Sequence, residues 1–139
     1  MSSNFLNADA LPQLLLIEPD SLVRSTVSGV CIQLGLAQVH QAASVAVAEQ
    51  VLANQPCDLV LISLSEEEPA FRLLEQLRAG AYVSSSQIPV AATTRTAGAD
   101  LVTKVRALQV RRLLLQPYKI RDVVHTVESI AAEIERGVH

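Results

Sequence analysis

Short, continuously apolar segments alternate five times along the chain with longer segments whose apolar residues recur every three to four positions. The short runs are typical of strands buried on both faces, and the longer spacing is typical of amphipathic helices. The predicted strands are 14–17, 37–42, 58–64, 88–93 and 112–116. Strands that alternate with helices in this way predict an α/β domain, with helices covering both faces of a parallel sheet.

The helices are predicted between these strands and after the last one. They span about 21–34, 45–55, 69–79, 101–108 and 120–134. In the first helix we expect Leu22, Val27 and Leu34 to face inward. Asp20 or Ser21 should cap the first helix, and Ser44 should cap the second. Right-handed crossovers leave few topologies. The expected one is the flavodoxin-like doubly wound sheet, a three-layer α/β/α arrangement with strand order 2-1-3-4-5.

Length and composition limit what this fold can do. The chain has 139 residues, of which 50% are hydrophobic, so we expect one domain over 12–136 after a disordered lead-in over 1–11. That lead-in has no signal-peptide pattern, and no apolar run approaches the roughly 20 residues of a membrane span, so we expect a cytoplasmic location. A net charge of -3 and 3% aromatic residues disfavour direct binding to nucleic acid. Cys31 and Cys57 are expected to be reduced.

Four segments stand in a distinctive order: LLLIEPDSLVR at 14–24, CDLVLISL at 57–64, IPV at 88–90 followed by Thr94, and LLLQPY at 113–118. Together they resemble the first, third, fourth and fifth strands of the receiver domain of bacterial two-component response regulators. The resemblance covers nearly the whole chain, from about residue 14 to residue 133. It implies a role in phosphorelay signal transduction.

The positions that carry phosphate chemistry in that family are replaced here. By resemblance, Ser63 stands where the family has its phosphorylated Asp, Glu18 and Pro19 where it has the acids that hold Mg²⁺, and Gln116 where it has a Lys; Thr94 matches. Phosphoryl transfer depends on positioning and on neutralising the phosphate oxygens. A serine without a base is a poor nucleophile, and proline has no side-chain oxygen for Mg²⁺. We therefore expect a non-enzymatic domain without Asp phosphorylation, metal or cofactor.

Two alternatives stay open at this site. In the first, Asp20 or the acidic run 66–68 forms a relocated metal site in an active receiver. The competing explanation is that Asp20 caps the first helix and the glutamates lie in a solvated turn. In the second alternative, a small molecule fills the vacated pocket. Within that pocket we expect Ser63 to bond to Gln116, and Thr94 to make local hydrogen bonds where its strand ends.

The resemblance also implies where a partner binds. Receivers signal through the surface of the fourth helix, the fifth strand and the fifth helix, so we expect a protein partner, or a second copy in a homodimer, to bind there. The residue at the family's switch-aromatic position is Leu113, which indicates a domain that does not switch in the usual way. A basic cluster contributes to this region: Arg95, Lys104, Arg106, Arg111 and Arg112. The candidate surface residues are Arg106, Arg111, Arg112, Leu113, Tyr118 and Arg121.

Overall fold

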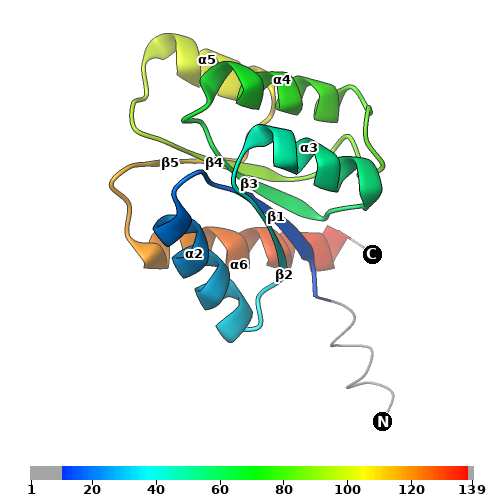
Figure 1. The fold of residues 1–139 in the computed structure, drawn as a ribbon, viewed down its shortest axis with the longest axis vertical. Coiled ribbons are helices and arrows are strands. Elements are labelled where there is room, and N and C mark those ends of the chain that lie inside the picture. The colour runs from blue at the N-terminus through cyan, green and yellow to red at the C-terminus, as the bar shows by residue number, and fades with distance from the viewer. Residues whose placement is uncertain (1–10, 138–139) are drawn as a thin grey trace.

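The computed structural model describes residues 11–137 and shows a parallel sheet between two layers of helices (Figure 1). The strands are β1 (Gln13–Ile17), β2 (Gln38–Ala42), β3 (Leu59–Ser63), β4 (Val90–Thr94) and β5 (Arg112–Leu115). The helices are α2 (Ser21–Gln33), α3 (Val45–Asn54), α4 (Glu67–Arg78), α5 (Ala99–Ala107) and α6 (Ile120–Gly137). The strand order β2-β1-β3-β4-β5 confirms the predicted flavodoxin-like topology.

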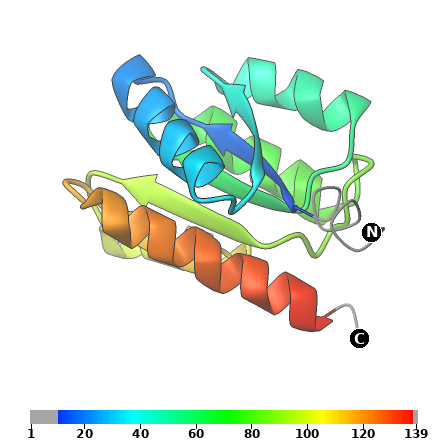
Figure 2. The ribbon, with the colours of Figure 1, turned by 90° about the horizontal axis from the view of Figure 1, so that it is seen from below.

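The two helical layers divide the core into two clusters. Side chains of α3, α4 and α5 pack on one face of the sheet, and those of α2 and α6 pack on the other. Figure 2 views the molecule from the side of α2 and α6, with the sheet behind them. All residues of β3 and β4 are buried, whereas the edge strands β2 and β5 are partly exposed. This burial on both faces explains why the central strands are continuously apolar in sequence.

The predicted cap of α2 is confirmed, but the prediction of which residues of α2 face inward is partly wrong. Asp20 Oδ1 accepts the backbone N–H groups of Leu22 and Val23, both at 3.0 Å, so Asp20 caps α2 as predicted. Leu22 and Leu34, however, are 75% and 58% exposed, and Val27 and Cys31 carry the packing. Leu22 lies in the first turn and Leu34 at the C-cap of α2, so both lie at the ends of its packed stretch.

Other boundaries move by a few residues. Helix α4 begins at Glu67, two residues before the predicted start, and β4 occupies Val90–Thr94 in place of 88–93. Ser44 caps α3 as predicted, because its Oγ accepts the N–H of Val47 at 3.2 Å. The expected lead-in over 1–11 lies, apart from the half-buried Leu11, outside the described residues.

The described residues also bear on two composition-based expectations. Cys31 and Cys57 are both free and buried. Burial raises the pKa of both thiols, that of Cys57 to about 11, with the nearby charge of Asp58 as a second cause there. Within residues 11–137, none of the helices is both long enough and apolar enough to span a membrane.

Candidate functional site

A crevice of about 810 Å³ opens at the carboxyl edge of the sheet, beyond the ends of β1, β3 and β5. In a doubly wound sheet this edge carries the functional site, because the connections on either side of the switch point diverge there. Five of the six site positions predicted from the sequence line the crevice: Glu18, Pro19, Asp20, Ser63 and Gln116. The topology therefore brings together residues from three separate strand ends.

Ser63 lies at the end of β3 and is 7% exposed. It forms hydrogen bonds with Ser65, two residues further along the chain. Its hydroxyl donates to Ser65 Oγ at 3.0 Å and accepts the N–H of Ser65 at 3.3 Å. The predicted bond from Ser63 to Gln116 is wrong. Gln116 Oε1 instead accepts from Arg95 Nε at 3.4 Å, so the amide is drawn toward the loop after β4.

Thr94, the sixth predicted site residue, does not line the crevice. Its hydroxyl donates to the carbonyl of Thr96 at 2.8 Å and accepts the N–H of Thr96 at 3.3 Å. This confirms the predicted local hydrogen bonding where the strand ends. The hydroxyl is thereby committed to holding the turn that follows β4.

Glu18 is the buried acid of the crevice, with 6% of its surface exposed. Burial is the main cause that raises the pKa of its carboxyl group, and the charge of Asp20 adds to it. A hydrogen bond from the Asp20 N–H to Glu18 Oε2 at 2.9 Å opposes that rise, and so do the charges of Arg24 and Arg95. Arg24, however, points its Nη1 at the Glu18 carbonyl, 2.8 Å away. The carboxylate is therefore desolvated without a close ion pair.

Tyr118 belongs to the crevice as well as to the chain segment expected to bind a partner. It is half-buried, packs against the core cluster under α2 and α6, and lines the crevice. Burial and then the charge of Glu18 raise the pKa of its phenol, and a hydrogen bond with Gln116 opposes the shift. Sequence reasoning placed Tyr118 on the partner surface and did not place it in the crevice, which it also lines.

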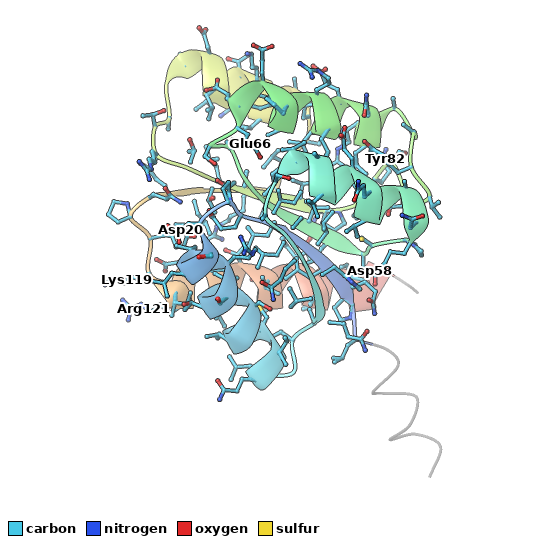
Figure 3. All side chains as sticks on the ribbon, viewed as in Figure 1. Asp20, Asp58, Glu66, Tyr82, Lys119 and Arg121 are labelled. Atoms are coloured by element: carbon cyan, nitrogen blue, oxygen red, sulfur yellow. The ribbon has the colours of Figure 1, made fainter. Side chains whose placement is uncertain are left out.

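The other acids considered as metal ligands have structural roles. Glu66 Oε1 accepts the N–H of Val45 at 3.0 Å, at the start of α3. Glu66 lies in the predicted turn before α4, but its half-buried carboxylate is not left to solvent, because it serves a neighbouring helix N-terminus. Glu67 and Glu68 are exposed, and Glu68 pairs with Arg72 at 3.6 Å. Figure 3 shows Asp20 and Glu66 at the starts of helices in different layers.

The residues of the crevice do not fit the Mg²⁺ ion that the resemblance would require. Mg²⁺ takes oxygen ligands in near-octahedral geometry, commonly including one or two carboxylates. Pro19 supplies no side-chain oxygen, and Asp20 Oδ1 is committed to the start of α2. Across residues 11–137, no three His, Cys, Asp or Glu side chains come together in a way that could hold a metal.

The predicted partner surface is brought together only in part. Arg106 on α5, Arg112 on β5 and Arg121 on α6 are exposed. Leu113 is half-buried and packs against the core beneath α3, α4 and α5. Arg111 is exposed and pairs with Glu133 of α6. Three of the six residues are thus both exposed and outside the ion pairs found in the described part of the chain.

The predicted basic cluster is divided among different surroundings. Lys104 Nζ lies 5.3 Å from the ring centroid of Phe71 on α4, a cation–π contact on the far side of α5. Arg95 lines the crevice. These two side chains therefore do not extend the surface formed by α5, β5 and α6.

The solved structures that resemble this chain include receiver domains. A response regulator receiver domain protein (CheY-like) from Methanospirillum hungatei matches with a TM-score of 0.78 and 17% identity, covering 92% of this chain and 99% of that one. The non-phosphorylated HemR receiver domain from Leptospira biflexa matches with a TM-score of 0.76 and 21% identity, covering 86% and 94%. The signal receiver domain of a putative Luxo repressor protein from Vibrio parahaemolyticus gives 0.78 and 12%, covering 91% and 95%.

No protein-family model matches the chain, and no curated protein matches it in sequence. At these identities the structural likeness establishes the fold. This chain therefore has the CheY-like, flavodoxin-like fold. The chemistry of its crevice must be argued from its own residues.

Proposed function

We propose that this chain is a signalling domain that works by binding a protein partner, without phosphorylation on aspartate and without enzymatic activity. The observation that carries the proposal is Ser63, a buried hydroxyl bonded to Ser65 at the end of β3. Asp20 and Glu18 lie in the same crevice, but neither is placed beside that hydroxyl by a hydrogen bond in the described residues. Without a base, the hydroxyl is a weak nucleophile.

Three replacements act together against phosphoryl transfer. Removing one preorganised charge or donor typically lowers transition-state stabilisation by about 3–4 kcal/mol. Here the acceptor is Ser63, a metal-ligand position is Pro19, and the cation position is the neutral Gln116, which bonds to Arg95. Restoring any one of them leaves the other two deficits in place. The domain therefore uses its outer surface for signalling.

The partner is proposed to bind the surface of α5, β5 and α6. Arg106, Arg112 and Arg121 are exposed there, and the edge strand β5 also exposes Leu115 by 52%. Exposed cations beside an apolar side chain on a sheet edge suit an acidic protein surface. A second copy of the chain is the competing partner. The proposal places the domain in the cytoplasm, where two free buried cysteines stay reduced.

The experiment restores the missing groups one by one. The wild type, Ser63→Asp, Pro19→Asp, Gln116→Lys and the triple variant are incubated with acetyl phosphate and Mg²⁺, and intact mass is recorded. We expect a hydroxylamine-labile phosphoryl adduct on the triple variant alone. An adduct on the wild type that hydroxylamine removes would overturn the proposal and would favour the alternative of a rearranged acidic site.

A second candidate function, small-molecule sensing, has one observation in its favour. The crevice volume of about 810 Å³ lies within the range of ligand pockets, and its lining combines polar and apolar side chains. Sensing and partner binding are compatible, because a ligand at the carboxyl edge would alter the loops that lead into α5 and α6.

A further inference from the structure

Glu18 lines the crevice, and one oxygen of its carboxylate has no hydrogen-bond partner among the described residues. Glu18 is 6% exposed and lines the crevice. Its Oε2 accepts the N–H of Asp20 at 2.9 Å, and no hydrogen bond to its Oε1 is found among the described residues. A buried ion that lacks a close counter-charge is destabilising, so the arrangement favours a cationic occupant.

The cations near Glu18 are engaged elsewhere. Arg24 Nη1 donates to the carbonyls of Glu18 and Pro19, at 2.8 and 3.5 Å. Arg95 is exposed, and its Nε donates to Gln116 at 3.4 Å. Both guanidinium groups oppose the rise in the pKa of Glu18 from a distance. The crevice therefore holds two carboxylates, Glu18 and Asp20, and one cation at its rim.

Two further cations lie at the same end of the molecule. Lys119 and Arg121 are both exposed, and Figure 3 shows them on the same side as Asp20. Neither of them lines the crevice. In the described part of the chain, neither of them forms an ion pair with Glu18 or Asp20.

Part of the lining of the crevice is apolar. Leu22 is 75% exposed and Ile120 is 38% exposed, and both line the crevice together with Pro19, Val23 and Pro117. A bare ion would leave these side chains in water. An aliphatic stem attached to a cationic head would cover them, in the way that lysine stems lie along apolar surface while the charged end reaches a polar group.

We propose that the crevice binds a primary alkylammonium group, with the charged head against Glu18 and the aliphatic chain against Leu22 and Ile120. The Asp20 carboxylate adds negative charge, and the hydroxyls of Ser63 and Ser65 line the same space and offer acceptor oxygens for the ammonium N–H groups. A lysine side chain of a partner protein and a free small amine share this chemistry. The inference deepens the proposed function, and it rests on that proposal in requiring a crevice free of a phosphoryl group.

The test is a titration of the full chain, labelled with ¹⁵N, with n-pentylammonium chloride. The amide resonances of Glu18, Ser63, Ser65 and Gln116 should shift and saturate. Pentan-1-ol has the same chain without the charge. It should bind more weakly by a factor of about ten or more, as expected for the loss of a charge-assisted hydrogen bond. Equal binding of the alcohol and the amine would overturn the proposal.

Two variants of crevice residues and one control variant test whether the amine binds at this site. Glu18→Gln keeps an acceptor for the Asp20 N–H and should weaken pentylammonium binding about tenfold or more. Glu67→Gln, which removes an exposed acid outside the crevice, should bind like the wild type. Gln116→Lys carries its own ammonium into the lining and should block the added amine. Unchanged binding by Glu18→Gln or by Gln116→Lys would contradict the site.

Two further titrations distinguish a partner's lysine from a free amine and test Mg²⁺ as a competing ligand. A peptide, acetyl-Gly-Lys-Gly-amide, binding more tightly than pentylammonium would identify a partner's lysine as the source, and the reverse order would identify a free amine. Saturable shifts of the same resonances with MgCl₂, but not with pentylammonium, would overturn the inference. Phosphodonor labelling is measured separately. Failure to bind the amine therefore leaves the proposed function standing, and labelling of the wild type removes it.

Discussion

The amino and carboxyl edges of the sheet differ in how fully their polar and charged side chains are hydrogen-bonded. At the amino edge, Arg78 is half-buried at the end of α4, and its N–H groups donate to backbone carbonyls. Its Nε donates to Leu108 at 2.8 Å, its Nη1 to Ile88 at 2.6 Å and Ser86 at 2.9 Å, and its Nη2 to Gln109 at 3.3 Å. One side chain therefore joins the loops that lead into β4 and β5.

Other side chains extend this pattern along the amino edge. Asp58 Oδ2 accepts the N–H of Gln13 at 2.8 Å, and Ser84 Oγ accepts the N–H of Cys57 at 2.8 Å. Figure 3 shows Asp58 at the opposite end of the molecule from Asp20. These bonds tie together the segments that precede β1, β3 and β4, so the amino edge is built for stability.

The carboxyl edge leaves polar groups less satisfied. Glu18 is buried there with one free oxygen, and the hydroxyl of Thr93, next to Ser63 across β3 and β4, has no hydrogen-bond partner among the described residues. A protein tolerates such groups where they serve a site. The contrast indicates that stability resides mainly at the amino edge and function at the carboxyl edge.

The largest expected effect tests the amino edge. Arg78→Ala leaves four carbonyl contacts without their donor, and we expect the free energy of unfolding to fall by about 3 kcal/mol. Urea denaturation measures this change. The matched control is Arg72→Ala on the same helix, where loss of an exposed ion pair should change stability by less than about 1 kcal/mol. Equal losses in the two variants would show that Arg78 is not a stabilising clamp.

A smaller loss is expected at the start of α2, beside the crevice. Asp20→Ala removes the acceptor for the N–H groups of Leu22 and Val23, and should lower stability by about 1 kcal/mol. Asp20→Asn keeps a capping oxygen and should retain most of the stability. If Asn destabilises as much as Ala, the charge of Asp20 matters more than its capping bond.

Glu18→Gln should raise stability at neutral pH. Burial raises the folded-state pKa of Glu18 above its ordinary value of 4.5, so the folded state binds the proton more readily than the unfolded state. The stability contributed by this group therefore falls as the pH rises through the interval between the two pKa values. The advantage of Gln should be largest above the folded-state pKa of Glu18 and shrink as the pH falls toward 4.5. Thermal melts across this range measure it, and a pH-independent difference would contradict the assignment.

The smallest effect concerns the buried thiols. Since burial raises the pKa of Cys57 to about 11, only about one thiol in a thousand is ionised at pH 8. Iodoacetamide should therefore alkylate the native chain slowly, and both cysteines should react rapidly in urea. Mass spectrometry follows the reaction. Alkylation of native Cys57 at the rate seen in urea would show that the amino edge opens readily.

Sequence patterns predicted the repeated alternation of strands and helices. The alternation of apolar runs and helical spacing identified every strand, and right-handed crossovers then selected the strand order. Local rules also predicted the caps at Asp20 and Ser44, because a capping side chain bonds within three residues of itself. The exposure of Leu22 was missed because helical spacing alone does not show where the sheet ends beneath a helix.

The rest of the site depends on contacts between distant residues. Glu66 serves the N-terminus of α3, and Arg95 takes the amide of Gln116, although neither pair is close in sequence. Arg78 likewise bonds to loops up to 31 residues away. No local spacing rule encodes these bonds. The sequence identified five of the residues that line the crevice, while the structure was needed to find the others and to show how they are bonded.

The most direct test of the central claim asks whether the crevice still accepts a phosphoryl group. Beryllium fluoride with Mg²⁺ mimics a phosphoryl group on a carboxylate, and amide spectra of the ¹⁵N-labelled chain report its binding. We predict that the amide resonances of positions 63, 65 and 94 stay unchanged in the wild type and shift in the triple variant Ser63→Asp, Pro19→Asp, Gln116→Lys. Saturable shifts of these resonances in the wild type would contradict the account.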